Sequence, residues 1–574
     1  MKIKHLFGLA VIAAMTASCS SNEDLGTAGP GTGTNETGVG YATFTINLPS
    51  VSGTRAADAG GAEMDEGTAN EYAVKSATAL IFQKYGSDEG SCKFVESVDL
   101  PTAAADWTDD TTIGITTTKK LVAKLTNVDT KNQYYVLVLL NNNKKTGGVK
   151  VALPTVGQSY NEWNSQILTP SVDDLAADND FYMANAPLKG TASPTTLVTI
   201  NKENIYSSKE KAEAGTSAAT VYVERGVAKM SVTDPTTKTV IDKATNNPTK
   251  STVEFNNWAL DITNRKTYAV HNIDDLSTDF PDIWTTPRFI GTNSRVYWGK
   301  DPNYNLDNLN TGKEAEREKE FNFIKATSGI NKTFAESAYC LENTFNLANM
   351  YQGQTTRVIF KATYAPKDDT GKSLAEPDGT FYTIGNMTTI LNETALETAV
   401  NTAATSVLPG CTVDYTTNLK QEGSHVITLA DIKDSNGTTL VADKVYSGKT
   451  GTEIVKEIND KLGLIDGAGH AEAMVGINTY AQGVTYYIAR VKHFGSLTPW
   501  NSGESYGTNN GKYLGRYGML RNNWYELTVG NVYGPGYPGV PPVDPNQPDD
   551  ENEKYLSVSV KILSWAKRSD IVDL

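Results

Sequence analysis

Cysteine and histidine are both scarce in this chain, which removes most metal-centred and nucleophilic chemistry from consideration. There are 4 cysteines and 5 histidines in 574 residues. No CxxC pair occurs, so a zinc site of the usual ligand spacing is not expected. The P-loop glycine pattern is absent as well. We therefore expect no metal, no cofactor and no enzyme activity.

Basic residues are also fewer than acidic residues. Lys and Arg number 51 against 66 Asp and Glu, which gives a formal net charge of −15. This balance argues against a nucleic-acid partner, because such partners require a basic face. Charged residues make up only 20% of the chain, whereas Thr, Asn, Gly and Tyr are abundant. That composition favours strands and turns over helices, and the length predicts two domains.

Two short motifs resemble functional sites but lack the context that they need. The segment Gly503–Gly507 fits the G-x-S-x-G pattern of a hydrolase, with Ser505 as the nucleophile. That motif requires a strand before it and a helix after it, and both flanks here have the composition of loops. The oxygen-rich stretch Asp301–Asp307 suggests calcium ligands but lacks the glycine of an EF-hand turn. We interpret both as loops.

The N-terminus is predicted to be an export signal, residues 1–18. A basic start with Lys2 and Lys4 precedes an apolar run that is too short to span a bilayer. Small residues then lead to Cys19, as in a bacterial lipoprotein box; an ordinary secretory signal is the alternative. Lipidated Cys19 would anchor the precursor to the outer membrane. Setting Cys19 aside leaves three cysteines, for which we favour buried thiols over one disulfide plus one thiol: Cys92, Cys340 and Cys411.

Similar strand patterns occur at the two ends of the chain. Residues 41–48 alternate apolar and polar side chains, with Phe44, Ile46 and Leu48 on one face, and residues 556–562 do the same. The apolar positions of the second segment are Leu556, Val558, Val560 and Ile562. Arg55 follows the first segment within a small-residue stretch of the kind that proteases cut. A Pro/Gly-rich and then acidic segment, residues 534–554, precedes the second and is predicted to be a semi-extended spacer.

Between the two ends, most periodic segments predict strands separated by polar turns. Helical patterns are few and short. The fold class is therefore mostly β, with antiparallel sandwiches and a few short helices. The expected strands include residues 73–85, 134–140, 220–232, 253–262, 357–364, 484–491 and 523–529, and the expected helices are residues 161–168, 314–326, 389–403 and 453–464.

Several segments, in order along the chain, resemble the fimbrillins of the minor-fimbrium (Mfa) type, the subunits of Bacteroidetes type V pili. Together with the lipoprotein signal they span most of the sequence, although residues 270–350 and 365–450 do not align. The segments are Val221 to Lys229, Trp258 to Tyr268, Tyr480 to Tyr487, Arg521 to Tyr525, and Val558 through Trp565 to Leu574.

The resemblance implies a mechanism. A lipidated precursor reaches the cell surface, and an extracellular Arg-specific protease cuts between Arg55 and Ala56. The strand bearing Phe44, Ile46 and Leu48 is then removable, and the C-terminal strand of another copy fills the groove. The resemblance also implies two transthyretin-like, Greek-key sandwich domains and a role in adhesion and biofilm formation. The implied partners are other copies of the chain together with anchor and tip subunits of the same fimbrium.

The expected organisation has six parts. They are the signal peptide (1–18), a lipidated propeptide with the removable strand (19–55), an N-terminal sandwich (56–225), a C-terminal sandwich (226–533), the spacer (534–554) and the donor strand (555–574). We expect a fimbrial shaft subunit at the outer membrane and cell surface. The alternatives are an accessory or tip subunit, and a monomeric surface lipoprotein whose aromatic residues bind glycans.

Overall fold

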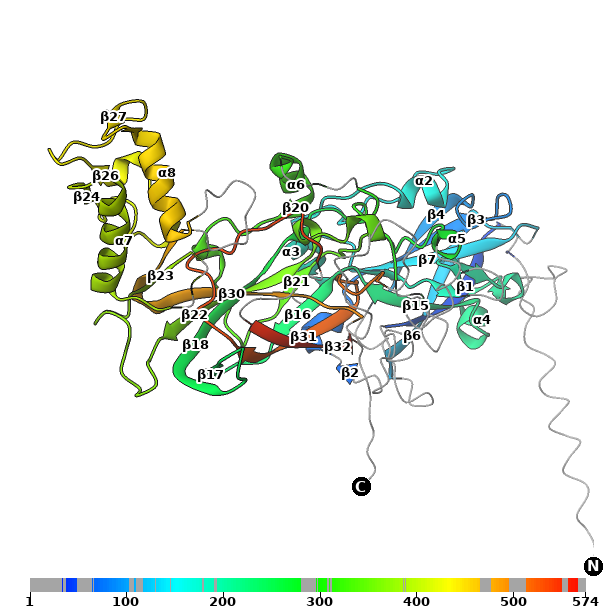
Figure 1. Ribbon diagram of the computed structural model, residues 1–574. Coiled ribbons are helices and arrows are strands. Elements are labelled where there is room, and N and C mark those ends of the chain that lie inside the picture. Colours follow the sequence, from blue (N-terminus) through cyan, green and yellow to red (C-terminus); the bar gives the residue numbers. More distant parts are fainter. Residues whose placement is uncertain are drawn as a thin grey trace, which may run out of the picture.

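The computed structural model shows an elongated, mostly β molecule with few short helices (Figure 1). This confirms the predicted fold class. The structure describes residues 34, 38–48, 64–65, 67–102, 108–109, 117–129, 131–144, 146–177, 180–189, 194–279, 296, 298–306, 309, 312–385, 387, 389–464, 476–494, 513–549 and 556–565. Among these residues, no helix has the length and apolar character that a membrane crossing requires.

The first part of the chain forms a ten-stranded sheet system, with its main path in the order β4-β3-β7-β10-β15-β1-β6-β5. Strand β15 pairs with β10 through Val223–Arg225 and with β1 through Ala219–Tyr222, so it belongs to both halves. The strands are β1 (Gly40–Asn47), β3 (Ala77–Gln83), β4 (Lys93–Leu100), β5 (Thr108–Asp109), β6 (Thr117–Leu125), β7 (Tyr134–Leu140), β10 (Met183–Asn185), β13 (Val198–Ile200), β14 (Ile205–Tyr206) and β15 (Ala219–Arg225).

Strand β7 lies at the centre of this part, as its continuous apolar sequence predicts. It pairs with β3, β10 and β13, and six of its seven residues are buried. Short elements surround the sheet strands. They are α1 (Ala69–Tyr72), α2 (Tyr160–Asn164), α3 (Val172–Leu175), α4 (Lys209–Ala214), β8 (Ala176–Ala177), β9 (Asp180–Phe181), β11 (Leu188–Lys189) and β12 (Pro194–Thr195).

The second part of the chain forms a nine-stranded sheet with the main order β2-β32-β31-β17-β18-β22-β30. Its core includes Trp258, Phe360 and Tyr525, all fully buried. The strands are β2 (Met64–Asp65), β16 (Ala228–Val232), β17 (Thr237–Ile241), β18 (Pro248–Asp261), β21 (Ala338–Cys340), β22 (Arg357–Ala365), β30 (Val484–Arg490), β31 (Asn523–Val532) and β32 (Leu556–Trp565). Beside them lie α5 (Leu276–Asp279), α6 (Glu314–Glu320), β19 (Thr263–Asn264) and β20 (Phe321–Asn322).

A lobe with its own hydrophobic core is inserted between β22 and β30 and lies at one end of the molecule (Figure 1). Two helices, α7 (Glu393–Val407) and α8 (Gly451–Leu462), pack against each other through Leu396, Val400 and Ile454. The sequence predicts both helices but not that they form a separate core. The lobe's strands are β23 (Phe381–Ile384), β24 (Thr412–Val413), β25 (Gly423–His425), β26 (Ile432–Lys433), β27 (Val445–Tyr446), β28 (Lys449–Thr450) and β29 (Ile477–Tyr480).

The chain passes from the first sheet to the second at Gly226. A Cβ at this glycine would lie 2.9 Å from the ring of Tyr182, so a larger residue would not fit. Next to it, the buried Lys229 ammonium lies 2.9 Å from Glu71 and 3.4 Å from the centre of the Trp524 ring. Burial opposes the charged form of Glu71, but Lys229 and the Tyr339 hydroxyl outweigh it and lower the pKa of Glu71. This ionic contact fastens α1 to the second sheet.

Residues 534–549, which we call the strap, lie against the second sheet, although their composition predicts a spacer. The Tyr480 hydroxyl donates to the carbonyl of Gly536, and Tyr486 and Tyr537 form a backbone bridge. Farther along, the buried guanidinium of Arg357 donates to the carbonyls of Pro541 and Pro542. Proline lacks an N–H but keeps a carbonyl acceptor, so a Pro-rich segment can still be held by donors on its neighbours.

We expect Arg357→Met to release the strap. The Arg357 Nε atom lies 2.8 Å from Asp261 Oδ2, and both side chains are buried. The substitution removes the ion pair of Asp261 Oδ2 and leaves two carbonyls without their donor, so the free energy of unfolding should fall by about 3–5 kcal/mol. Urea unfolding measures this loss, and limited proteolysis should show new cuts between residues 534 and 549. The exposed Arg265→Met is the matched control; equal loss in both variants would contradict the assignment.

Candidate functional site: the β1 position

Strand β1 lies inside the first sheet and not at its edge. It pairs along its whole length with β6 in antiparallel register, from Gly40↔Leu125 to Asn47↔Thr118. On its other side, Phe44–Asn47 pair in parallel with β15, and Tyr41 and Ala42 pair with β14. A chain without β1 would therefore have an open slot with unpaired backbone groups on both sides.

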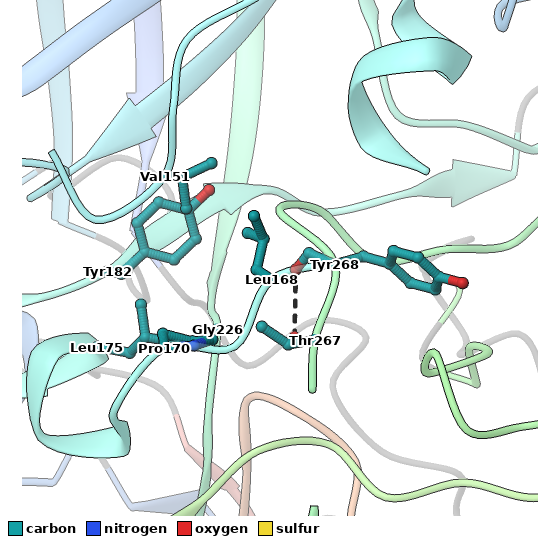
Figure 2. A pocket seen from close by; sticks show the side chains of 8 residues that line it. All are labelled: Val151, Leu168, Pro170, Leu175, Tyr182, Gly226, Thr267 and Tyr268. Carbon is teal, nitrogen blue, oxygen red and sulfur yellow. Dashed lines mark hydrogen bonds between the residues drawn. The ribbon is translucent and has the colours of Figure 1, made fainter. Parts of the chain in front are cut away.

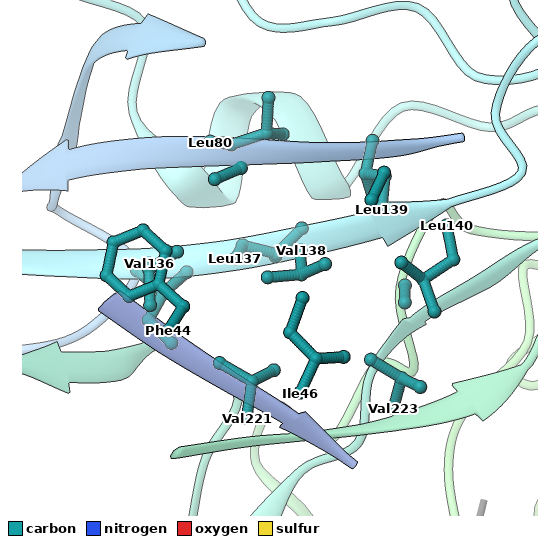
Figure 3. Packing of buried hydrophobic residues seen from close by; sticks show 14 of the residues in the cluster. Phe44, Ile46, Leu80, Val136, Leu137, Val138, Leu139, Leu140, Val221 and Val223 are labelled. Atoms are coloured by element: carbon teal, nitrogen blue, oxygen red, sulfur yellow. The ribbon is translucent and has the colours of Figure 1, made fainter. Parts of the chain in front are cut away.

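One face of β1 points into the hydrophobic core. Ala42, Phe44 and Ile46 have no exposed surface, and Leu48 is 3% exposed. The side chains of Phe44 and Ile46 meet those of β7, including Val136 and Val138 (Figure 3). The structure thus buries the side chains that the sequence predicts to face the core, and the period-two pattern was sufficient to identify them.

The opposite face of β1 is also covered, by the segment from α4 to the start of β15. The Thr43 hydroxyl donates to the carbonyl of Ala212 at 2.6 Å, and the hydroxyls of Thr45 and Ser217 lie 2.6 Å apart. The Ala218 N–H donates to the carbonyl of Thr43. This cover of the outer face was not predicted, because nothing in residues 209–218 identifies β1 as their partner.

The C-terminal strand β32 lies in the second sheet, outside the slot. It pairs antiparallel with β31 from Leu556↔Val532 to Ser564↔Asn523, and its last residues pair with β2. The expected donor residues Leu556, Val558, Val560 and Ile562 all belong to β32. The other three expected site residues, Cys19, Arg55 and Ala56, lie outside the described residues.

A second buried cluster connects the two sheets. His271 Nδ1 lies 2.9 Å from Glu224 Oε1 on β15, and its Nε2 lies 3.5 Å from Glu342 Oε1. Glu342 in turn lies 3.2 Å from the Nε of Arg521. Glu224 and Arg521 belong to two of the segments on which the family resemblance rests, so these segments meet in the fold. Their arrangement is that of a structural joint.

The joint also borders a small apolar recess (Figure 2). Its lining is almost entirely apolar, and hydrogen bonds between the backbones of Leu168 and Thr267 close one side. The recess has no space for a water-sized molecule, so it offers no ligand site. Its lining residues are Val151, Leu168, Pro170, Leu175, Tyr182, Gly226, Thr267 and Tyr268.

The titratable side chains in the part of the chain that the structure describes form no metal-binding group. No group of three or more His, Cys, Asp or Glu side chains there could hold a metal ion. Cys92, Cys340 and Cys411 are buried free thiols, as favoured from the sequence, and burial raises the pKa of Cys340 to about 12. Ser505 with its G-x-S-x-G motif, and Asp307, lie outside the described residues.

Asp301 is a buried carboxyl whose role is structural. It accepts hydrogen bonds from the backbone N–H groups of Asn303 and Thr344. Burial nevertheless raises its pKa to about 8, because the charged form is poorly solvated. Asp301 therefore acts as a neutral connector between two loops near neutral pH.

We expect Phe44→Ala to destabilise the uncleaved precursor strongly. The ring is fully buried, so its removal leaves a cavity and should lower the free energy of unfolding by about 3–5 kcal/mol. Chemical denaturation of residues 20–574 measures the change. Tyr85→Ala serves as the control, since that ring is 65% exposed. A loss below about 1 kcal/mol at Phe44 would mean that β1 is not part of the core.

The raised pKa of Asp301 predicts a pH dependence of stability. The folded state keeps a proton up to about pH 8, whereas the unfolded chain releases it near pH 4. Stability contributed by this proton should therefore fall as the pH rises from about 4 to about 8. Asp301→Asn should flatten that decline in unfolding experiments. Asp242→Asn, at an exposed turn, should leave the decline unchanged, and equal curves for wild type and Asp301→Asn would refute the assignment.

Comparison with known proteins gives a family match at the C-terminus. Residues 478–570 match the family described as major fimbrial subunit protein type IV, fimbrillin, C-terminal. The matched region contains β30, β31, the strap and β32. No curated protein matches the sequence.

Two solved structures are weakly similar in shape. The tip fimbrial protein Mfa3 from Porphyromonas gingivalis, with C-terminal truncation, is 10% identical with a TM-score of 0.30 and covers 92% of this chain and 100% of its own. A fimbrial assembly protein from Parabacteroides distasonis is 13% identical with a TM-score of 0.27, covering 61% and 94%. Scores this low carry no argument, so the assignment rests on the C-terminal match. Through that region the chain is similar to the fimbrillins, the family that its sequence resembles.

Proposed function

We propose that this fimbrial subunit of the cell surface is a shaft subunit of the minor-fimbrium type, assembled by exchange of β1 for the C-terminal strand of another copy. The precursor is a lipoprotein lipidated at Cys19. A surface Arg-specific protease cuts after Arg55, and copies then join into a homopolymer with anchor and tip subunits. The observation that carries this proposal is the interior position of β1, flanked by β15 and β6.

The order of sites along the chain supports the proposal. Strand β1 lies between Cys19 and Arg55. A cut after Arg55 would leave β1 covalently joined to the lipid anchor and no longer to the rest of the protein. The remainder could then separate from the membrane by releasing one strand. The slot left behind would accept a strand of similar pattern through backbone hydrogen bonds and apolar pockets.

The energies involved allow both tight retention and exchange. Burying Ala42, Phe44, Ile46 and Leu48 holds β1 in place before cleavage. The donor residues Leu556, Val558, Val560 and Ile562 offer roughly 6–12 kcal/mol at about 1.5–3 kcal/mol each. Ordering the donor and separating it from β31 subtract from this gain. Exchange is therefore expected to require release of β1 first.

An accessory or tip subunit is the alternative within the family. Such a subunit needs either the slot vacated by β1 or the donor strand β32, but not both. A tip subunit would keep β32 beside β31 throughout. A monomeric glycan-binding lipoprotein would need neither cleavage nor β32. The three functions therefore differ in what the cleaved protein forms. A shaft subunit would form long polymers, an accessory or tip subunit short capped polymers, and a glycan-binding lipoprotein no polymer.

Cleavage by an Arg-specific protease should turn purified residues 20–574 into a ladder on an unheated SDS gel. Arg55→Lys should stay monomeric because it keeps the charge but not the cleavage site. A variant with Val558→Asp and Val560→Asp should be cut but form no ladder, because charged residues cannot fill apolar pockets. Mass spectrometry confirms the cut at Arg55. Monomer alone after confirmed cleavage would refute the proposal.

A chain that ends at residue 554 separates the shaft from the tip role. Mixed with cut wild-type protein, it should shorten the ladder, because it still accepts a strand but donates none. Far-UV circular dichroism and thermal unfolding would first establish that the shortened chain is folded. Polymerisation of the shortened chain by itself would show that β32 is not the donor.

A further inference from the structure

The outer face of β1 supplies a second set of contacts that an incoming strand must satisfy. We propose that Ser557 and Ser559 of a second copy occupy the positions of Thr43 and Thr45 and thereby set the register of the inserted strand. This inference rests on the proposed strand exchange. It identifies hydroxyl groups, in addition to the apolar residues, as determinants of how copies join.

Two positions on the outer face of β1 suit small hydroxyl side chains. Thr43 is 2% exposed, and its hydroxyl lies 2.6 Å from the carbonyl oxygen of Ala212, which is itself fully buried. Thr45 meets the hydroxyl of Ser217 at 2.6 Å. Thr43 is buried, and an apolar replacement would leave the hydrogen bond to Ala212 unmade.

Strand β32 reproduces this double pattern at one alignment. When Leu556 is placed at Ala42, the inner positions of Phe44, Ile46 and Leu48 receive aliphatic residues throughout. At the same alignment, both outer threonine positions receive serine. The full correspondence runs from Ala42-Thr43-Phe44-Thr45-Ile46-Asn47-Leu48 to Leu556-Ser557-Val558-Ser559-Val560-Lys561-Ile562.

The remaining outer position is also compatible with this alignment. Lys561 takes the place of Asn47, which contacts the carbonyl oxygen of Val221 and the hydroxyl of Thr118. Both oxygens are acceptors for an ammonium group. The position lies at the end of β1, and Asn47 itself is 5% exposed, so the ammonium group would depend on these two acceptors.

Other alignments fail on one face or the other. A shift by one residue inverts every side chain. A shift by two in one direction places Lys554 at the fully buried Ala42 and Tyr555 beneath α4. A shift by two in the other direction places Ser564 in the apolar site of Leu48 and Leu563 at the polar site of Asn47. Only one register satisfies both faces.

Disulfide trapping tests the register directly. Thr45 lies opposite the exposed Lys120 on β6, so Ser559 of the incoming strand should lie opposite Lys120 as well. Directly opposed residues on antiparallel strands have Cα atoms about 4.5–5.5 Å apart, within the range of a disulfide. The three native cysteines of residues 20–574 are buried, which limits unwanted pairing.

The experiment combines Lys120→Cys with one cysteine on β32, at Ser557, Ser559 or Lys561. After cleavage and mild oxidation, we expect reducible covalent ladders for Ser559→Cys alone. Covalent ladders at Ser557→Cys or Lys561→Cys, or a non-covalent ladder with no cross-link in any pair, would overturn the register while leaving strand exchange intact. Absence of any ladder, even non-covalent, would instead overturn the proposed function and this inference with it.

Hydroxyl replacement tests the role of the serines. Ser557→Ala should speed loss of the non-covalent ladder about five- to tenfold on dilution into mild denaturant, as expected for one lost hydrogen bond. Ser557→Thr should restore the wild-type rate, because Thr43 shows that threonine fits. Equal rates for Ala and Thr variants would refute the hydroxyl contact. The control is Ser564→Ala, whose position lies beyond the slot in the proposed register.

Discussion

Strand β1 is the link between the two halves of the first sheet. It joins β6 to β15, and β15 joins the remaining strands through β10. Its inner side chains pack against β7, and its outer face is held by α4 through Thr43 and by Ser217 through Thr45. A strand in this position cannot leave without separating β6 from β15. The slot therefore selects a replacement by backbone, core and hydroxyl contacts together.

The connection between the two sheets is polar and buried. Lys229 is placed between Glu71 and Trp524, and His271 between Glu224 and Glu342. Removing one partner of a buried ion pair such as Lys229–Glu71 strongly destabilises the fold, so the contacts between the sheets define one relative orientation. The sequence segments that resemble the fimbrillins around residues 221–229 and 521–525 include several of these residues.

The predictable features of this chain were those encoded locally. Period-two alternation located β1 and β32, and the continuous apolar run located β7. The expected single strand at 220–232 is divided at Gly226, where Tyr182 leaves no room for a side chain and the chain changes sheets. The helical patterns at 389–403 and 453–464 agree with α7 and α8 to within a few residues.

The features that the sequence did not predict depend on contacts between residues that are far apart along the chain. The strap has a spacer's composition, and it is fixed by donors such as Arg357 and Tyr480 that no local pattern connects with it. The contact of Ala212 with Thr43 likewise joins residues far apart in sequence. The repeated hydroxyls in both terminal strands were visible in the sequence, but their meaning required the position of α4.

The order of strands also determines how a fimbrium built in this way would carry tension. A pull on the inserted strand would pass to β15, continue through Gly226 into β16, and cross to β31 by the parallel pairing of Lys229–Val232 with Trp524–Leu527. From β31 it would leave through the strap and β32. The hydrogen bonds between these paired strands would have to break together when the strands slide, which resists extension. The helical lobe branches from the ends of β22 and β30, so it lies off this path and would stay folded while the fibre is stretched.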